Sequence, residues 1–391
     1  VAVNNVGHCH PKVVDTIRKE CGLLGHTPDS PTPYTQKLLE KLSQIVPGNL
    51  KGNVSSICAL SGSSAIEMAV KFARMASGKP LILGFQGGHH GALGTALALS
   101  TATSRLSNHR MLVPFVVHIG PYAYCYRCPF NLKYPDCDLQ CAKYVEYQIS
   151  SPYCGIDVKE VAALVVEPIQ AEGGYVVPPD GFLNYIKAMC ERLGIWFISD
   201  EVQVGMGRTG KMFGIEQYGI EPDMLVLGKA LGGDLPLGAV IAKKDIVKNL
   251  PPNSHVLTAA ANHITAAAAC TNIDLLQDGL LERATALGNY TMAKLGEIAR
   301  EREIIGDIRG KGLAIAIELV KNRESKKPIE PKDTIGIIRE LRNKGVLDLP
   351  CGRHSNCVRI IPPLTITKNH LDKGLEILSE VLKEVEKNIL E

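Results

Sequence analysis

The sequence predicts an α/β protein built from a large domain and a smaller one. Short apolar, β-branched runs alternate with amphipathic helical patterns through the first two thirds of the chain, which is typical of buried strands in a mostly parallel sheet covered on both faces. From about residue 278 the pattern changes to long charged helices with isolated strands between them. At 391 residues, the chain also exceeds the usual size of a single-core domain.

The strands of the large domain are expected at the short apolar runs themselves. Helical patterns such as residues 65–76 and 181–193 follow some of these runs, and this alternation is the reason for expecting mostly parallel strands. The expected strands span residues 57–60, 81–85, 163–166, 195–199, 224–227 and 238–242.

The smaller domain is expected to be of the α+β type. Its strand patterns are "GLAIAIELV" and "CVRIIPP", and its helical patterns span residues 280–302, 334–344 and 368–389. Pro and Ser residues in "TPDSPTPY", residues 27–34, mark a connection near the start of the chain. We therefore expect an N-terminal segment that joins the small domain (1–30), a large domain (31–277) and a C-terminal small domain (278–391).

Composition indicates a small-molecule partner. Hydrophobic residues make up 45% of the chain, charged residues 21%, and the net charge is +3 without any long run of Lys or Arg. This gives no electrostatic footprint for nucleic acid or an anionic membrane. Because no run approaches the roughly 18–20 apolar residues of a membrane span and no signal-peptide pattern opens the chain, we expect a cytoplasmic protein.

Four of the twelve cysteines form a cluster. Cys125, Cys128, Cys137 and Cys141 lie in "CYRCPFNLKYPDCDLQC", with C-x2-C-x8-C-x3-C spacing. The central gap is shorter than in the common zinc pattern, and the Pro and Tyr content indicates a surface excursion. The thiols could be disulfide-bonded, free or metal-bound, and we favour a structural role. None of these states makes the cluster catalytic, and we assign no metal ligand.

A possible anion site lies in "ALSGSSAIEMAVKFAR", where a strand runs into Ser61, Gly62, Ser63 and Ser64 before a helix. Free N–H groups and the positive end of the helix dipole favour a phosphate, and small residues permit its close approach. Ordinary capping of the helix by serine explains the same residues.

A strand-end carboxylate follows in "LGIWFISDEVQVGMGRTG", where the apolar run stops at Asp200 and Glu201. Ligands of open α/β sheets bind beyond the carboxyl ends of the strands, so such an acid could meet a cationic nitrogen. A solvated strand-end acid is the alternative. The stretch "GMGRTG" does not form the strand-to-helix turn of a dinucleotide site.

A strand-end lysine lies in "EPDMLVLGKALGGDLPLGAV", where Lys229 follows an apolar run. A buried ammonium is costly unless it is neutralised or paired, whereas a desolvated amine becomes a nucleophile toward an aldehyde. A lysine that reaches solvent is the alternative. Arg359 likewise interrupts the apolar strand "CVRIIPPLTIT", where it would bind a carboxylate or face solvent.

Taken together, these motifs resemble the class III aminotransferases of fold type I, which depend on pyridoxal 5'-phosphate (PLP). The resemblance covers nearly the whole chain and points to the branch that includes 4-aminobutyrate aminotransferase. It implies a large domain with a mostly parallel seven-stranded sheet. The segments that carry it are "NNVGHCHP", "VVEPIQAEGGY", "ISDEVQVGMGRTG", "LGKALGGDLPLGAV", "RGKGLAIAIEL" and "RIIPPLTIT".

The resemblance implies roles for residues around PLP. Lys229 would form the Schiff base and move the proton, and Asp200 would keep the pyridine nitrogen protonated, which makes the ring an electron sink. Thr258 would reach the phosphate from the neighbouring subunit, so a homodimer, or a tetramer of paired dimers, is expected. The other cofactor contacts would be Gly62 and Ser63 at the phosphate, Val202 behind the ring, Gln203 near the phenolic oxygen, and His89 stacked on the ring where the family has an aromatic residue.

The resemblance also bears on the substrate. Arg359 would bind a substrate carboxylate, and Glu172 in "IQAEGG" would pair with Arg359 when the substrate is an ω-amine. This pair favours transfer from an ω-amino acid such as 4-aminobutyrate to a keto acid such as 2-oxoglutarate. A second arginine of many family members is replaced by Ala92 here, which leaves an amino-acid racemase and a dialkylglycine-type decarboxylase as alternatives. A PLP-binding protein without catalysis is disfavoured because Lys229 and Asp200 are both present.

Overall fold

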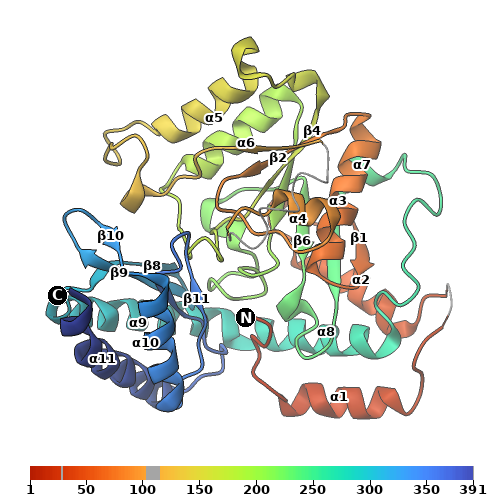
Figure 1. Ribbon diagram of the computed structural model, residues 1–391. Helices are drawn as coiled ribbons and strands as arrows, with labels where there is room; N and C mark the ends of the chain where they lie inside the picture. The colour runs from red at the N-terminus through yellow and green to blue at the C-terminus, as the bar shows by residue number, and fades with distance from the viewer. Residues whose placement is uncertain (28–29, 103–114, 391) are drawn as a thin grey trace.

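The computed structural model describes residues 1–27, 30–102 and 115–390 (Figure 1). Residues 28–29 of the expected connection lie outside this part of the chain. A seven-stranded sheet forms the centre of the larger lobe, and its strand order is β1-β7-β6-β5-β4-β2-β3. The strands are β1 (Val54–Ala59), β2 (Leu81–Phe85), β3 (Val116–Ile119), β4 (Val161–Val166), β5 (Trp196–Asp200), β6 (Met224–Leu227) and β7 (Gly238–Lys243).

Strand direction in this sheet is mostly parallel, as the sequence predicts. Strands β3, β2, β4, β5 and β6 pair in parallel along the sheet, whereas β7 is antiparallel to both β6 and β1. Strand β1 therefore runs in the same direction as β6. The six expected strands are confirmed, with ends displaced by at most three residues, and β3 is a seventh that the apolar runs did not predict.

Successive side chains of a strand point to opposite faces of the sheet, and apolar side chains are buried on both faces. Leu83, Leu164 and Phe197 belong to the core on one face, which helices α2, α6 and α8 share, and Ile82 and Ile198 belong to the core on the other, which α3 covers. The helices of this lobe and its N-terminal segment are α1 (Pro11–Cys21), α2 (Pro33–Ile45), α3 (Gly62–Ser77), α4 (Gly94–Leu99), α5 (Gln140–Ser150), α6 (Phe182–Leu193), α7 (Lys244–Val247) and α8 (His263–Leu275).

A second, five-stranded sheet and three helices form the other lobe, drawn in cyan and blue at the lower left of Figure 1. Its pairings are all antiparallel, and a separate apolar core lies between the sheet and the helices. The three expected helices and both expected strands are present. The elements are α9 (Leu281–Glu301), α10 (Pro331–Asn343), α11 (Lys368–Leu390), β8 (Ile305–Lys311), β9 (Ala314–Asn322), β10 (Lys327–Pro328), β11 (Pro350–Cys351) and β12 (Cys357–Ile360).

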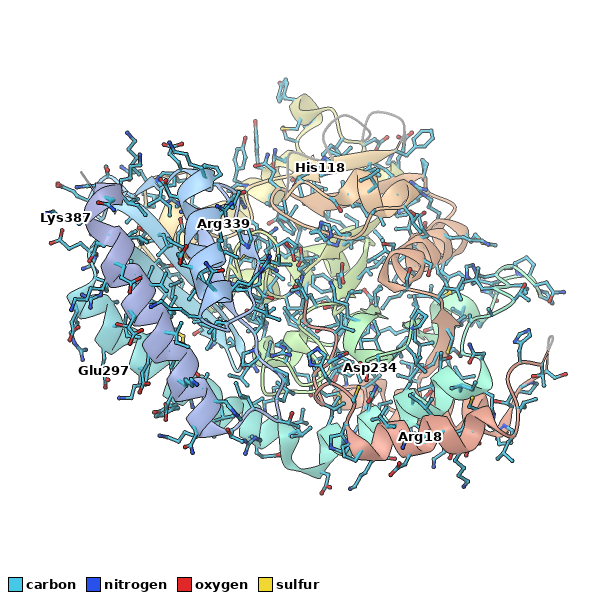
Figure 2. All side chains as sticks on the ribbon, turned by 60° about the horizontal axis from the view of Figure 1, so that its bottom comes forward. Arg18, His118, Asp234, Glu297, Arg339 and Lys387 are labelled. Carbon is cyan, nitrogen blue, oxygen red and sulfur yellow. The ribbon has the colours of Figure 1, made fainter. Side chains whose placement is uncertain are left out.

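The helices present charged residues outward and apolar residues inward. Arg18 on α1, Glu297 on α9, Arg339 on α10 and Lys387 on α11 are exposed and lie on the outer surface of the molecule (Figure 2). Within residues 1–27, 30–102 and 115–390, no helix combines the length and apolarity required to span a bilayer.

The N-terminal segment contacts both lobes. Helix α1 packs on α8, and the amide of Leu364, beyond β12, donates to the carbonyl of Asn5 at 2.8 Å. The buried Arg208 guanidinium donates to Asn5 Oδ1 at 2.5 Å and to the Pro362 carbonyl at 2.6 Å. Arg208 therefore joins the loop after β5, the start of the chain and the smaller lobe. The domain boundaries at residues 30 and 277 stay predictions.

Candidate active site

The candidate site lies where the carboxyl ends of five strands meet. Because β1, β2, β4, β5 and β6 run in the same direction, the residues that follow them share one edge of the sheet. Asp200 ends β5 and Lys229 comes two residues after β6. The strand order thus gathers chemistry-bearing side chains from distant parts of the sequence.

Lys229 is held in an unusual backbone conformation at the end of β6. Its φ is +39°, in the left-handed region that side chains other than glycine rarely adopt and that is often found at functional sites. Burial lowers the pKa of its amine, although the carboxylates of Asp200, Glu172 and Glu167 act in the opposite sense. Among the described residues, none forms a hydrogen bond or ion pair with its Nζ, so this amine is available to react.

Asp200 is 3% exposed and makes two close contacts. Its Oδ2 lies 2.7 Å from Nδ1 of His90, which is also buried, and its Oδ1 accepts from the amide of Val202 at 3.0 Å. Burial lowers the pKa of His90, but the hydrogen bond and the charge of Asp200 outweigh it and raise that pKa overall. The contact with Asp200 therefore favours the charged form of the His90 imidazole.

Glu167 is a buried carboxylate that the sequence did not single out. It follows β4 directly, and it accepts from the amides of His89 at 2.8 Å and Ala171 at 3.0 Å. Burial raises the pKa of Glu167 to about 7, while the neighbouring His90 acts in the opposite sense. Glu167 thus holds the backbone at His89. A polar residue directly after an apolar strand was the signal that could have found it.

His89 and His90 differ in their surroundings, although they are adjacent in the sequence. The imidazole of His90 binds Asp200, whereas Nδ1 of His89 is buried without a hydrogen-bond partner among the described residues. Burial lowers the pKa of His89, and Lys229 is one of the charges that act on it. His89 therefore favours the neutral form, and its Nδ1 is left without a partner among the described residues.

Helix α3 begins at the same edge and is held there by close backbone contacts. Ser61 caps it and accepts from the amide of Ser64 at 3.2 Å, as the capping alternative required. A Cβ on Gly62 would lie 2.7 Å from Cγ1 of Val202, so no larger residue fits. Ser63 accepts from the amide of Ala92 at 3.2 Å, which joins the helix start to the histidine loop.

Arg359 and Glu172 form a two-pronged ion pair. Nη1 and Nη2 of Arg359 lie 2.9 and 3.2 Å from the two carboxylate oxygens of Glu172, and Gln203 donates to that carboxylate at 3.2 Å. Burial opposes ionisation, but the Arg359 hydrogen bonds and charge lower the pKa of Glu172 to about 2. Tyr175, which the sequence did not single out, donates to Oε1 of Gln203 at 3.2 Å and lies in the same buried group.

Two strand-end or loop residues stand apart from this site. The buried carboxylate of Glu201 accepts from the amides of Gly214 and Ile215 at 2.7 and 2.9 Å, so it holds the following loop rather than a ligand. Thr258 is exposed in the loop before α8, and no contact within the described residues joins it to Lys229 or Asp200. A single chain therefore does not bring Thr258 into the site.

The residues at the sheet edge fit the cofactor that the sequence implied. A buried amine without a partner suits an aldehyde, a buried carboxylate suits a pyridine nitrogen, and the narrow start of α3 suits a phosphate. All three features lie at the carboxyl edge of one sheet, where ligands of open α/β folds bind.

Comparison with known proteins agrees with this fit. A family model described as aminotransferase class-III matches residues 1–382. The chain is 38% identical to a leucine/methionine racemase of Thermococcus litoralis, over 98% of this chain and 85% of that protein, and 34% identical to the 4-aminobutyrate aminotransferase of Escherichia coli, over 98% and 88%.

Solved structures give the same result. The taurine:2-oxoglutarate aminotransferase from Bifidobacterium kashiwanohense, solved in complex with PLP and glutamate, is 25% identical, with a TM-score of 0.89 over 98% of this chain and 87% of that one. The chain therefore belongs to the class III aminotransferases, a family of PLP-dependent enzymes.

Proposed function

We propose that this enzyme transfers an amino group from an ω-amino acid such as 4-aminobutyrate to a keto acid such as 2-oxoglutarate. The observation that carries the proposal is the bidentate pair between Arg359 and Glu172. An ω-amine brings no α-carboxylate to Arg359, and Glu172 then neutralises the buried guanidinium. A keto acid does bring one, and Arg359 binds it when Glu172 moves away.

The chain's own residues divide the chemistry among them. Bound PLP supplies an aldehyde for the substrate amine and a ring that accepts electrons when a bond at the substrate carbon breaks. Lys229, whose amine is kept less basic by burial, would hold the cofactor through its aldehyde carbon and would carry the proton at the substrate carbon. Asp200 would keep a proton on the pyridine nitrogen, and His90 orients its carboxylate through the contact between Nδ1 and Oδ2.

Subunit contacts complete the proposed site. Thr258 is exposed on the single chain, so it is free to reach the phosphate site of a second copy. Gly62 and Ser63 at the start of α3 would hold the same phosphate from within the chain. This supports a homodimer in which each site uses residues of both subunits.

The substrate preference should change when the gate is opened. Glu172→Ala leaves the Arg359 guanidinium without its carboxylate, so ω-amines should lose kcat/KM relative to α-amino acids by at least about tenfold, because one partner of a buried ion pair is removed. Steady-state kinetics with 4-aminobutyrate and with glutamate would measure the ratio. Glu160→Ala, at an exposed carboxylate, is the control, and an unchanged ratio would rule out the gate.

Cofactor retention should depend on His89. His89→Ala removes the proposed stacking partner, and because such contacts contribute about 0.5–1.5 kcal/mol, the Kd for PLP should rise by about 2- to 13-fold. Titration of the apoenzyme with PLP, followed by cofactor absorbance, gives the Kd. His26→Ala, at an exposed histidine, should leave the Kd unchanged. An unaltered Kd for His89→Ala would remove His89 from the site.

A second candidate function is racemisation of amino acids. The leucine/methionine racemase of Thermococcus litoralis and the alanine/serine racemase of Pyrococcus horikoshii are 38% and 36% identical to this chain. Ala92 is exposed beside the histidine loop where many aminotransferases of the family have a second arginine, which favours smaller substrates without a distal carboxylate.

One experiment separates the candidates. Purified enzyme is given single amine donors while the absorbance of bound cofactor is recorded and the products are assayed. If 4-aminobutyrate changes the cofactor spectrum, 2-oxoglutarate restores it and glutamate is formed, the proposal stands. If an α-amino acid loses its optical purity without forming keto acid, the enzyme is a racemase, and release of carbon dioxide would identify a decarboxylase.

A further inference from the structure

Four cysteines that have no part in the proposed chemistry gather around one small cavity. Cys125, Cys128, Cys137 and Cys141 all line a cavity of about 20 Å³ between β3 and α5. A space of this size holds little more than one water-sized guest, for which roughly 10–15 Å³ suffices. The first and last cysteines are sixteen positions apart in the sequence, so the loop itself brings the thiols to a common point.

Local backbone structure explains how the loop achieves this. Cys125 begins a short 3-10 helix (Cys125–Arg127), and Cys141 lies in the first turn of α5. Between them, the amide of Cys137 donates to the carbonyl of Lys133 at 2.9 Å. Asp138 and Leu139 have φ values of +44° and +52°, a costly conformation for two successive residues with side chains. The chain is thus bent sharply so that Cys137 and Cys141 return toward Cys125 and Cys128.

The rest of the cavity wall offers few donor atoms besides sulfur. It is formed largely by aromatic, leucine and proline side chains, and no Asp, Glu or His lines it. The hydroxyls of its buried tyrosines Tyr122 and Tyr124 are already bonded, to the Pro168 and Glu167 carbonyls and to the Glu318 carboxylate. Hard cations such as Mg²⁺ and Ca²⁺ require oxygen ligands, whereas Zn²⁺ accepts four thiolates in a tetrahedral site.

We propose that Cys125, Cys128, Cys137 and Cys141 bind one Zn²⁺ as a tetrathiolate. Each thiol loses its proton to solvent when its sulfur binds, so four protons are released for each ion. Within the described residues no three side chains yet surround one point as metal ligands, so the cysteine side chains must rotate inward on binding.

The metal would stabilise the contact between the two lobes. Arg127, between the first two cysteines, donates to the buried carboxylate of Glu318 on β9, and Lys326 donates to the carbonyl of Tyr126 at 2.7 Å. Glu318 and Lys326 both belong to the smaller lobe, so a metal that orders the cysteine loop would also hold its contacts with that lobe. We therefore expect loss of the metal to lower thermal stability, with the proposed reactive residues left in place.

The test begins with the unaltered holoenzyme, purified under reductant. Elemental analysis is expected to find one zinc per chain, and exchange for Co²⁺ should give the absorbance of a tetrahedral, all-sulfur site. Cys125→Ser/Cys128→Ser should lose the zinc and melt at lower temperature, while Cys154→Ser, at an exposed cysteine outside the cluster, should keep both.

Three results would overturn the proposal, and none of them depends on whether the double variant folds. Unaltered enzyme that contains no zinc and has four reactive thiols at these positions would show that the cluster is free. Disulfides between these cysteines under the same conditions would show a covalent staple, and iron with labile sulfide would show a cluster of another kind. None of these outcomes bears on the proposed transfer reaction.

Discussion

Replacing Lys229 by alanine should lower the rate of amino-group transfer by on the order of 10⁴-fold or more, because one side chain supplies both the attachment point and the proton carrier. The amine lies at the end of β6 in a strained backbone conformation, and among the described residues it has no competing hydrogen bond or ion pair. Steady-state and single-turnover rates with the best donor would measure the loss.

The chemical state of the cofactor supplies an independent check on Lys229. Borohydride reduction of the unaltered enzyme, followed by peptide mass mapping, should place the cofactor on the peptide that contains Lys229. The Lys229→Ala variant should bind PLP only reversibly. Lys159→Ala, at an exposed lysine, should behave like the unaltered enzyme. Full activity in Lys229→Ala, or a modified lysine elsewhere, would refute the assignment.

The sequence was sufficient to predict the fold class and the strand-end positions of Asp200 and Lys229, because both depend on local patterns. Apolar runs that stop at a polar residue mark the ends of buried strands, and Asp200 and Lys229 each follow such a run. Strand β3 escaped because it spans only Val116–Ile119 and three of its four side chains are only partly buried, so it lacks the continuous apolar run of β4.

The partners of these residues could not be predicted, because they depend on strand order. His90 meets Asp200 across 110 positions only because β2, β4 and β5 are consecutive in the sheet. Glu167 reaches the backbone of His89 for the same reason. Arg359 and Glu172, which are 187 positions apart and in different lobes, were paired by family resemblance rather than by any local pattern.

The difference between strand-end residues and residues of loops or of the smaller lobe also explains why the substrate is harder to infer than the reaction. In the proposed mechanism the strand-end amine and carboxylate act on the cofactor ring, and the fold determines the positions of both. The substrate contacts come from the smaller lobe and from loops, as Arg359 and Ala92 illustrate, and loops vary without disturbing the sheet. An aminotransferase and a racemase can therefore share the same buried core.

Asp200→Asn should lower kcat by on the order of 10³-fold, because an amide in place of the carboxylate cannot hold a proton on the pyridine nitrogen. The substitution keeps the shape of the side chain, so cofactor binding should fall far less than kcat. Asp180→Asn, at an exposed aspartate, is the matched control. A variant with undiminished kcat would show that the ring nitrogen is not charged by this residue.

Asp200→Asn also tests the pairing with His90, because it should change the pKa of His90 and the pH dependence of stability. Asp200 raises the pKa of His90 against the effect of burial, so removing the charge should let burial dominate and lower that pKa. In the unaltered enzyme the imidazolium form contributes stability that is present below the unfolded pKa of histidine and is lost as pH rises through the higher folded pKa. The difference in free energy of unfolding between the unaltered enzyme and Asp200→Asn should therefore become smaller as pH rises through the folded pKa of His90. NMR titration of the His90 ring, with unfolding measured at several pH values, distinguishes this coupling from simple loss of packing, which would not vary with pH.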